Sequence, residues 1–204
     1  MPHDEIRLPR AVHTQSYNTR MIEKMEALKR IGVEKIHLGI CIRDNCPDLP
    51  NKFHNDLDTD QIIASQYLLL PTIEEMKVHT FESLDPEFPQ KVKPGDYVVG
   101  GENFGCGSSR EQAPSVLKAL GVQAVVAKSF ARIFYRNAIN IGLPVIVCKD
   151  LPDAVSTGDE MELSLTEGVA KANGKVFSCT KLPPYMQQIL SQGGLIASLN
   201  KEEA

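Results

Sequence analysis

Three short apolar runs, separated by two segments with helical periodicity, limit the fold of this chain more than any other feature. The apolar runs cover 97–100, 122–127 and 145–148, and the helical segments cover 111–120 and 131–141. Gly121 and Gly142 follow the two helical segments, where a glycine often ends a helix. Strands that alternate with helices in this order usually pair in parallel. The pattern therefore predicts an α/β layer.

The C-terminal part of the chain has a different pattern. Met161, Leu163 and Leu165 alternate with polar residues, which is typical of a half-buried strand. Asn173-Gly174 lies between two strand-like runs and predicts a tight hairpin turn. A last helix is expected over 184–192, ending at Gly193-Gly194. We expect a β-rich end attached to the α/β layer.

The segments before the first apolar run divide at a loop rich in proline, Asp and Asn. The spacing predicts a helix over 17–30, a strand over 35–42 and a loop over 43–51. We therefore expect an N-terminal extension, 1–51, and a main domain, 52–204. Thr59 is expected to cap a short helix to Ile63, and Thr72 another to Lys77.

Composition excludes several function classes. The formal net charge is −4, with no basic, aromatic-interleaved stretch, so nucleic acid is not an expected partner. No apolar run has the length of a membrane span, and the first residues lack the apolar core of a signal peptide. The five cysteines are scattered and form no metal-binding spacing. We expect a cytoplasmic chain with reduced thiols and no metal of its own.

The segment 100–111 is the most informative for chemistry. Its four glycines permit positive φ angles and close approach of a ligand to the backbone, and a helix follows at once. Unpaired N–H groups at a helix start favour an anion. Ser108 and Ser109 add hydroxyls, and Arg110 adds a fork that matches a carboxylate. The segment predicts a site for a small carboxylate or phosphate.

A purely structural alternative remains open for this segment. Ser108, followed three residues later by Glu111, has the spacing of a capping box. The glycine spacing matches neither a P-loop nor a dinucleotide-binding fingerprint.

Two longer motifs extend the argument beyond the turn. The run Asn-Phe-Gly-Cys-Gly-Ser-Ser-Arg-Glu at 103–111, followed by Ala-Val-Val-Ala-Lys-Ser-Phe-Ala-Arg-Ile-Phe-Tyr-Arg-Asn-Ala-Ile-Asn at 124–140, closely resembles the swivel domain of the aconitase superfamily. Asp58-Thr59-Asp60 is similar to that family's upstream motif, and Gly193-Gly194-Leu195-Ile196 to the end of its small subunits. The resemblance covers about 53–204. It implies a swivelling β/β/α fold and a free-standing small subunit of the isopropylmalate isomerase and homoaconitase type.

The resemblance implies a hydro-lyase that dehydrates and rehydrates a hydroxy-acid. A [4Fe-4S] cluster serves there as Lewis acid, and because a cluster needs several grouped thiolates, we expect it on a large subunit. Ser108 would be the catalytic base, with Ser109 and Arg110 binding a substrate carboxylate. Asp60 would lie at the site and orient a partner, unless it is only a first-turn helix acid.

Supporting roles are expected for a second set of residues. Cys106 is interpreted as a small buried residue between glycines, with a nucleophilic thiol as the alternative. Arg132 and Arg136 lie four residues apart and share a helix face. One interpretation is that they support the site or the interface with the large subunit; the other is that they are solvated or ion-paired. The sequence Ala64-Ser65-Gln66 departs from the Pro-Ala-Arg that relatives commonly have there. The full supporting set is Gly105, Cys106, Gly107, Thr59, Tyr67, Leu68, Leu70 and Arg132.

Leu69 carries the substrate prediction. Relatives whose substrate carries a third carboxylate have arginine at this position, and the arginine pairs with that carboxylate. Leucine instead offers an apolar wall. The sequence therefore predicts interconversion of 2- and 3-isopropylmalate in leucine biosynthesis. The alternatives are a dimethylmalate, a methyl-substituted malate or homoaconitate as substrate, or a purely structural role for the leucines in the core.

The expected partners are a large, cluster-bearing second chain, in a heterodimer or heterotetramer, and a small hydroxy-dicarboxylate. Self-association of the isolated chain also stays open. Two non-enzymatic alternatives are an RNA-binding module and a carboxylate- or phosphate-binding scaffold.

Overall fold

The computed structural model describes residues 55–202, and side chains are described to Asn200. The helix expected over 17–30 and the strand expected over 35–42 lie outside the described residues.

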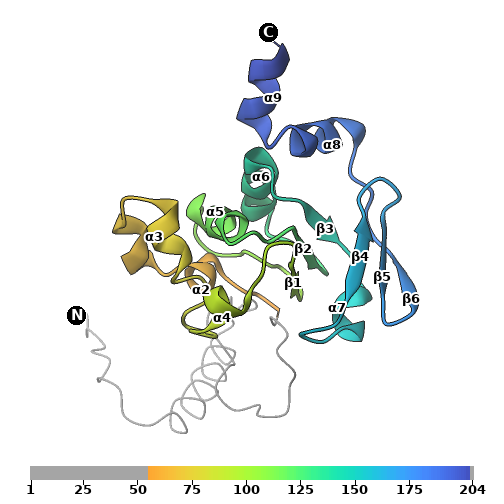
Figure 1. The fold of residues 1–204 in the computed structure, drawn as a ribbon, viewed down its shortest axis with the longest axis horizontal. Helices are drawn as coiled ribbons and strands as arrows, with labels where there is room; N and C mark the ends of the chain where they lie inside the picture. Colours follow the sequence, from red (N-terminus) through yellow and green to blue (C-terminus); the bar gives the residue numbers. More distant parts are fainter. Residues whose placement is uncertain (1–54, 203–204) are drawn as a thin grey trace, which may run out of the picture. The chain divides into compact units, whose positions relative to one another are not determined.

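A parallel sheet forms the centre of the described fold. Its strands are β1 (Tyr97–Gly100), β2 (Ala124–Ala127) and β3 (Val145–Val147), which lie in that order with both pairs parallel. Helix α5 (Gln112–Ala119) connects β1 to β2, and α6 (Arg132–Ile141) connects β2 to β3 (Figure 1). The predicted α/β layer is confirmed, with element bounds within two residues of those expected.

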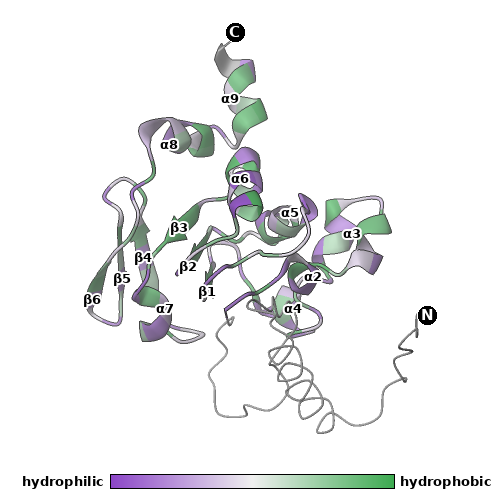
Figure 2. Cartoon of the chain, turned by 180° about the vertical axis from the view of Figure 1, so that it is seen from behind, coloured by the Kyte–Doolittle hydropathy of each residue, from purple (hydrophilic) through white to green (hydrophobic). Residues whose placement is uncertain are grey.

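The central strand of the parallel sheet, β2, lies entirely in the core. All four residues of β2 are buried, since the sheet is covered on both faces. From one side, α5 contributes Val116 and Leu117 to the core, and α6 contributes Phe134 and Ala138. Figure 2 shows α6 with polar and apolar residues on different sides of the helix. Periodicity of the apolar residues therefore determined which helix faces are buried.

A second sheet packs against the first. It is an antiparallel meander of β4 (Met161–Ser164), β5 (Val169–Ala172) and β6 (Lys175–Ser178). The turn between β5 and β6 has Asn173 at φ 50° and Gly174 at φ 71°, as a type I′ turn requires. Ala170 and Ala172 share a core with Val126 and Ile146 of the parallel sheet. The hairpin prediction is confirmed.

Short helices lead into the parallel sheet. They are α2 (Thr59–Ile62), the 3-10 helix η1 (Ser65–Leu69), α3 (Ile73–Lys77) and α4 (Phe88–Lys91). Thr72 caps α3 as predicted, through a bond from the Glu75 amide. The prediction that Thr59 caps α2 is wrong. Asp58 is the cap, in a reciprocal capping box with Gln61, and Thr59 is buried.

The C-terminal helices lie at the carboxyl end of α6, next to Gly142. Helix α8 (Pro184–Ser191) was predicted, whereas α9 (Leu195–Glu202), like α4 and α7 (Leu151–Ala154), was not. The Gly193-Gly194 turn between α8 and α9 lies against Gly142, and the Lys118 ammonium donates to the carbonyls of Ile141 and Gly193. No helix among residues 55–202 is long and apolar enough to cross a membrane.

Substituting Gly142 by alanine tests the contact that holds the C-terminal helices. Gly142 has φ 80°, and an added Cβ would lie 2.5 Å from the backbone carbon of Gly193. Strain and overpacking together predict a loss of about 2–5 kcal/mol in the free energy of unfolding. Urea titration followed by circular dichroism measures it.

Gly158→Ala is the matched control. Gly158 also has a positive φ, 94°, but nothing lies within 4 Å of the added Cβ. Only the conformational cost of about 1–2 kcal/mol applies. Equal losses for the two variants would contradict the close contact at Gly142.

Candidate active site

The glycine-rich loop that follows β1 is held on one side by the strand-like segment before α2. The amide of Gly105 donates to the Leu57 carbonyl at 2.7 Å, and the amide of Thr59 donates to the Cys106 carbonyl at 2.9 Å. Asp58 and Cys106 form a parallel bridge. Two segments about fifty residues apart in sequence are therefore fixed to each other by backbone bonds.

The same loop is held on its other side by the segment before α6. The Phe104 amide donates to the Ser129 carbonyl at 3.0 Å, and the Ala131 amide donates to the Phe104 carbonyl at 2.9 Å. The segments that precede α2, α5 and α6 thus lie side by side, beyond the carboxyl ends of β1 and β2 (Figure 1). Ligands of open α/β sheets bind at this edge.

Gly105 permits this close packing. Its φ is 77°, and a Cβ at this position would lie 2.3 Å from Cγ of Phe134. Gly107 has φ 87° but has ordinary space around it, its nearest neighbour being Asp58 Cβ at 3.4 Å. Gly105 is therefore required by both backbone and space, and Gly107 by backbone conformation alone.

Ser108 and Ser109 lie exposed at the end of this loop. Neither hydroxyl, nor either backbone amide, has a hydrogen-bond partner among residues 55–202. The Ser108 carbonyl, by contrast, accepts a bond of 2.9 Å from the buried Thr59 hydroxyl. The backbone at Ser108 is thus held in place while its donors face outward, as an anion site requires.

The capping-box alternative for Ser108 is wrong. Helix α5 begins only at Gln112, its N-cap residue is Glu111, and no side chain caps it. The helix therefore starts one residue after the expected Glu111, and both serines lie in the loop before it.

Arg110 is engaged within the chain. Its side chain is 10% exposed; Nη1 donates to the Ile63 carbonyl at 2.9 Å and lies 2.6 Å from Asp60 Oδ1. Nη2 donates to the Ser65 hydroxyl at 2.9 Å. Because a guanidinium has five N–H groups, two remain for a further acceptor.

Asp60 and Ser65 complete a closed triangle with Arg110. The Ser65 hydroxyl donates to Asp60 Oδ1 at 2.8 Å while it accepts from Arg110. Partial burial alone would raise the pKa of the Asp60 carboxyl, but hydrogen bonds from Arg110 and Ser65 outweigh it, so the pKa lies below its ordinary value. Asp60 is therefore ionised at neutral pH and orients Arg110.

The leucines after Tyr67 divide between core and surface. Leu68 and Leu70 are half-buried and pack against the core, whereas Leu69, at the end of η1, is 90% exposed. A core role is thus wrong for Leu69. Ser65, at the other end of η1, contacts Arg110, so Leu69 is carried by the same short helix that touches the arginine.

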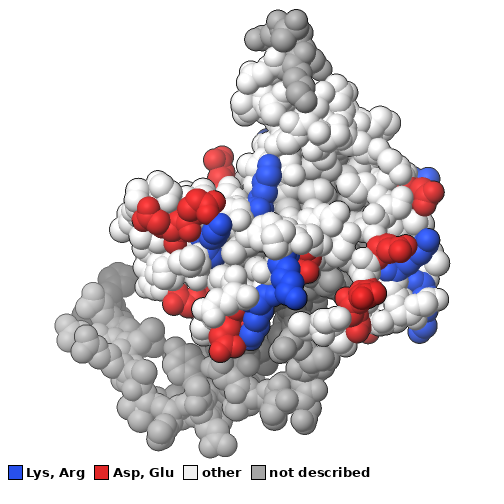
Figure 3. Space-filling model, viewed as in Figure 1, with Lys and Arg blue, Asp and Glu red and all other residues white. Residues whose placement is uncertain are grey.

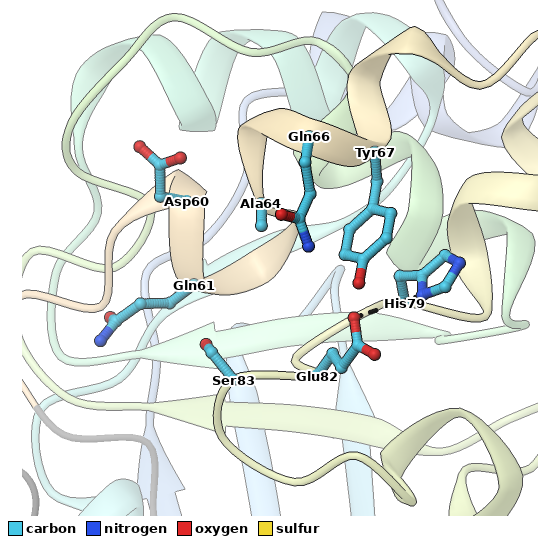
Figure 4. A pocket seen from close by; sticks show the side chains of 8 residues that line it. All are labelled: Asp60, Gln61, Ala64, Gln66, Tyr67, His79, Glu82 and Ser83. Carbon is cyan, nitrogen blue, oxygen red and sulfur yellow. Dashed lines mark hydrogen bonds and ion pairs between the residues drawn. The ribbon is translucent and has the colours of Figure 1, made fainter.

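A hollow of about 240 Å³ lies beside this helix (Figure 4). Its lining comes from α2, η1 and the segment after α3: Asp60, Gln61, Ala64, Gln66, Tyr67, His79, Glu82 and Ser83. The Tyr67 and His79 rings stack with centroids 3.7 Å apart and planes 5° apart. Nδ1 of His79 lies 3.2 Å from Oε2 of Glu82.

Cys106 is half-buried, and its thiol donates to the Asp56 carbonyl at 3.3 Å. Burial, followed by the nearby Asp58 and Asp56 carboxylates, raises the pKa of the thiol. A raised pKa leaves little thiolate, which favours the structural interpretation over a nucleophile.

Arg132 and Arg136 are exposed on α6, and neither forms an ion pair within the described part of the chain. Arg132 follows Ala131, which is bonded to the glycine loop, so Arg132 lies at its border. Arg136 is one turn farther along the helix.

The described residues do not suit an iron–sulfur cluster. No group of three or more His, Cys, Asp or Glu within 55–202 is arranged to hold a metal. Cys148 and Cys179 are buried in the core between the sheets, away from Cys106 on the glycine loop.

Three residues that sequence analysis did not place at the site are Ser65, His79 and Glu82. Ser65 stood out only as a departure from the common Pro-Ala-Arg pattern. His79 and Glu82 lie after the short helix that was expected to end at Lys77, and no periodic pattern marks them.

The sequence of this chain is similar to a known protein family and to several of its members. Residues 48–150 match the aconitase C-terminal domain. The isopropylmalate/citramalate isomerase small subunit of Methanocaldococcus jannaschii is 52% identical over 155 residues, which are 75% of this chain and 92% of that protein. The 3-isopropylmalate dehydratase small subunit 1 of Archaeoglobus fulgidus is 53% identical over 147 residues, 71% and 91% of the two chains.

A solved structure gives the same result for the fold. The crystal structure of 3-isopropylmalate dehydratase from M. jannaschii superposes with a TM-score of 0.71 at 45% identity, covering 74% of this chain and 91% of that one. The swivelling β/β/α fold that the resemblance implied is confirmed, and it contains one parallel and one antiparallel sheet among the described residues. This chain belongs to the aconitase C-terminal domain family.

Proposed function

We propose that this chain is the small subunit of a 3-isopropylmalate dehydratase, a hydro-lyase that interconverts 2- and 3-isopropylmalate in leucine biosynthesis. Relatives that are about half identical to this chain and are matched over about nine-tenths of their length are named 3-isopropylmalate dehydratase small subunits. The observation that carries the substrate choice is the exposed Leu69 on the same short helix as Ser65, a partner of Arg110.

Arg110, together with Ser108 and Ser109 at the end of the glycine-rich loop, would bind the substrate carboxylate next to the reacting carbons. The two remaining N–H groups of Arg110 match the two oxygens of a carboxylate, and Asp60 with Ser65 holds the guanidinium against rotation. The outward-facing amides and the hydroxyl of Ser109 would add donors. Binding would thereby fix the proton to be removed near Ser108.

Ser108 would remove that proton as the catalytic base. A free hydroxyl is a weak base, so its alkoxide must be stabilised by neighbouring donors. Asp60 already balances much of the Arg110 charge. We infer that the loop amides, more than Arg110, supply this stabilisation.

The other half of the site would come from a large subunit. The described residues lack a cluster ligand set, so the [4Fe-4S] Lewis acid that assists loss of the hydroxyl would be bound there. The exposed serines and Leu69 then face a substrate that both chains enclose.

We further propose that the chain acts in the cytoplasm, and that 1–51 is an extension outside the swivel domain, 52–204.

A methyl-substituted malate is the second candidate substrate. The relative from M. jannaschii is named for both isopropylmalate and citramalate. An apolar Leu69 accommodates a methyl group as well as an isopropyl group, although it gains less from the smaller one. Measuring kcat/KM for both substrates with the reconstituted complex decides between them.

An RNA-binding role has less support. On the face shown in Figure 3, acidic and basic side chains are interspersed and no basic stripe is visible. The formal net charge of −4 also opposes binding to a polyanion.

Substituting Ser108 by alanine tests the proposed base. We expect kcat of the reconstituted complex to fall about 10²–10⁴-fold, the usual contribution of a positioned proton acceptor. The fold should be unaffected, because the Ser108 hydroxyl has no partner among residues 55–202. Initial rates of isopropylmalate dehydration measure the effect.

Ser156→Ala is the control, since Ser156 is equally exposed but lies in the loop after α7. Its activity should equal that of the wild type. Full activity of Ser108→Ala would instead support a carboxylate-binding scaffold without a catalytic serine.

Replacing Leu69 by arginine tests the substrate choice. The exposed position tolerates the charge. The guanidinium should lower kcat/KM for isopropylmalate about 10- to 100-fold and introduce turnover of homoaconitate, whose extra carboxylate it can pair with. Leu69→Met keeps an apolar side chain and should stay within about threefold of the wild type. Efficient turnover of homoaconitate by the unaltered protein would overturn the argument from Leu69.

A further inference from the structure

The short helix η1 has little internal stability. It spans five residues, none of them buried, and its backbone bonds include Tyr67 to the Ala64 carbonyl and Leu70 to the Tyr67 carbonyl. Helices of this type are weak beyond three or four residues. Contacts from outside the helix must therefore set its orientation.

The direction of Leu69 depends on rotation of η1 about its axis. In a helix with three residues per turn, residues three apart share a face. Leu69 therefore shares a face with Gln66, and Tyr67 shares another with Leu70. A contact that fixes the Tyr67 ring also fixes the direction in which Leu69 projects.

His79 makes that contact. Its ring stacks flat on Tyr67, at 3.7 Å between centroids, and its Nδ1 lies 3.2 Å from the Glu82 carboxylate. The interaction of the Glu82 carboxylate with the Tyr67 hydroxyl, ahead of partial burial, raises the pKa of the phenol. Figure 4 shows the three side chains together at one end of the hollow.

The opposite end of η1 is anchored independently. Ser65, the first residue of η1, is hydrogen-bonded to both Asp60 and Arg110. Its position is therefore fixed relative to Arg110, the residue proposed to bind the substrate carboxylate. The Tyr67–His79 stack then fixes the rest of the helix. Together the two anchors set the position of Leu69 relative to Arg110.

We propose that His79 is a positioning residue for substrate specificity, which acts through Tyr67 and Glu82 to hold Leu69 at the apolar end of the site. The proposal rests on the proposed function, because it assigns the apolar end of that same substrate. His79 itself touches η1 and not the reacting atoms. Its loss should therefore affect recognition of the aliphatic group more than the chemical step.

Substituting His79 by alanine in the full chain removes the stack and the pair with Glu82. In the reconstituted complex, we expect the ratio of kcat/KM for isopropylmalate to kcat/KM for citramalate to fall about three- to tenfold, mainly through KM for isopropylmalate. His79→Phe keeps a stacking ring and should recover the ratio to within about twofold. Val78→Ala, at an exposed neighbouring position, should leave it unchanged.

Amide hydrogen exchange on the free chain provides a readout that does not depend on activity. Exchange across 65–70 should accelerate at least about threefold in His79→Ala and stay near the wild type in His79→Phe. Unchanged exchange, or equal losses of kcat for both substrates without a change in their ratio, would overturn the proposal. If the unaltered complex acts on neither substrate, the proposed function fails, and exchange alone then decides whether His79 fixes η1.

Discussion

The close approach of Gly105 to Phe134 is the constraint on which the rest of the site depends. A hydrogen in place of a side chain lets the loop after β1 lie directly against α6, where a Cβ would be 2.3 Å from the ring. With the loop in that place, its backbone pairs with the segment before α2 and with the segment before α6. A single small residue thus permits two sets of backbone bonds.

Those bonds bring together the residues of the proposed site. Thr59 holds the Ser108 carbonyl, and the turn after α2 reaches Arg110 through Asp60, Ile63 and Ser65. The serines need no partner of their own and face outward. The carboxylate site that we propose would therefore be preformed on this chain, and a second chain would provide its other wall. Pre-organisation of this kind reduces the entropy lost when a small substrate binds.

Sequence patterns predicted the regular elements well and the irregular ones poorly. The strands 97–100, 122–127 and 145–148 were found because buried parallel strands are continuously apolar. The turn at Asn173-Gly174 was found because few residue pairs adopt two positive φ angles. Helices α4, α7 and α9 were missed, since they are short or follow a glycine pair that usually ends a helix. The cap of α2 was assigned one residue too late, because Asp58 and Thr59 are both good caps.

The sequence by itself determined the α/β order and membership in the aconitase C-terminal domain family, because both depend on local residue types and on spacings along the chain. It also predicted an anion site at the glycine loop, and this stays a prediction. Tertiary structure decided which groups are free and which are engaged. Arg110 pairs with Asp60 and Ser65 across more than forty residues, Leu69 is exposed between two half-buried leucines, and His79 stacks on Tyr67. These contacts arise only when segments distant in sequence pack together, and no local pattern specifies them.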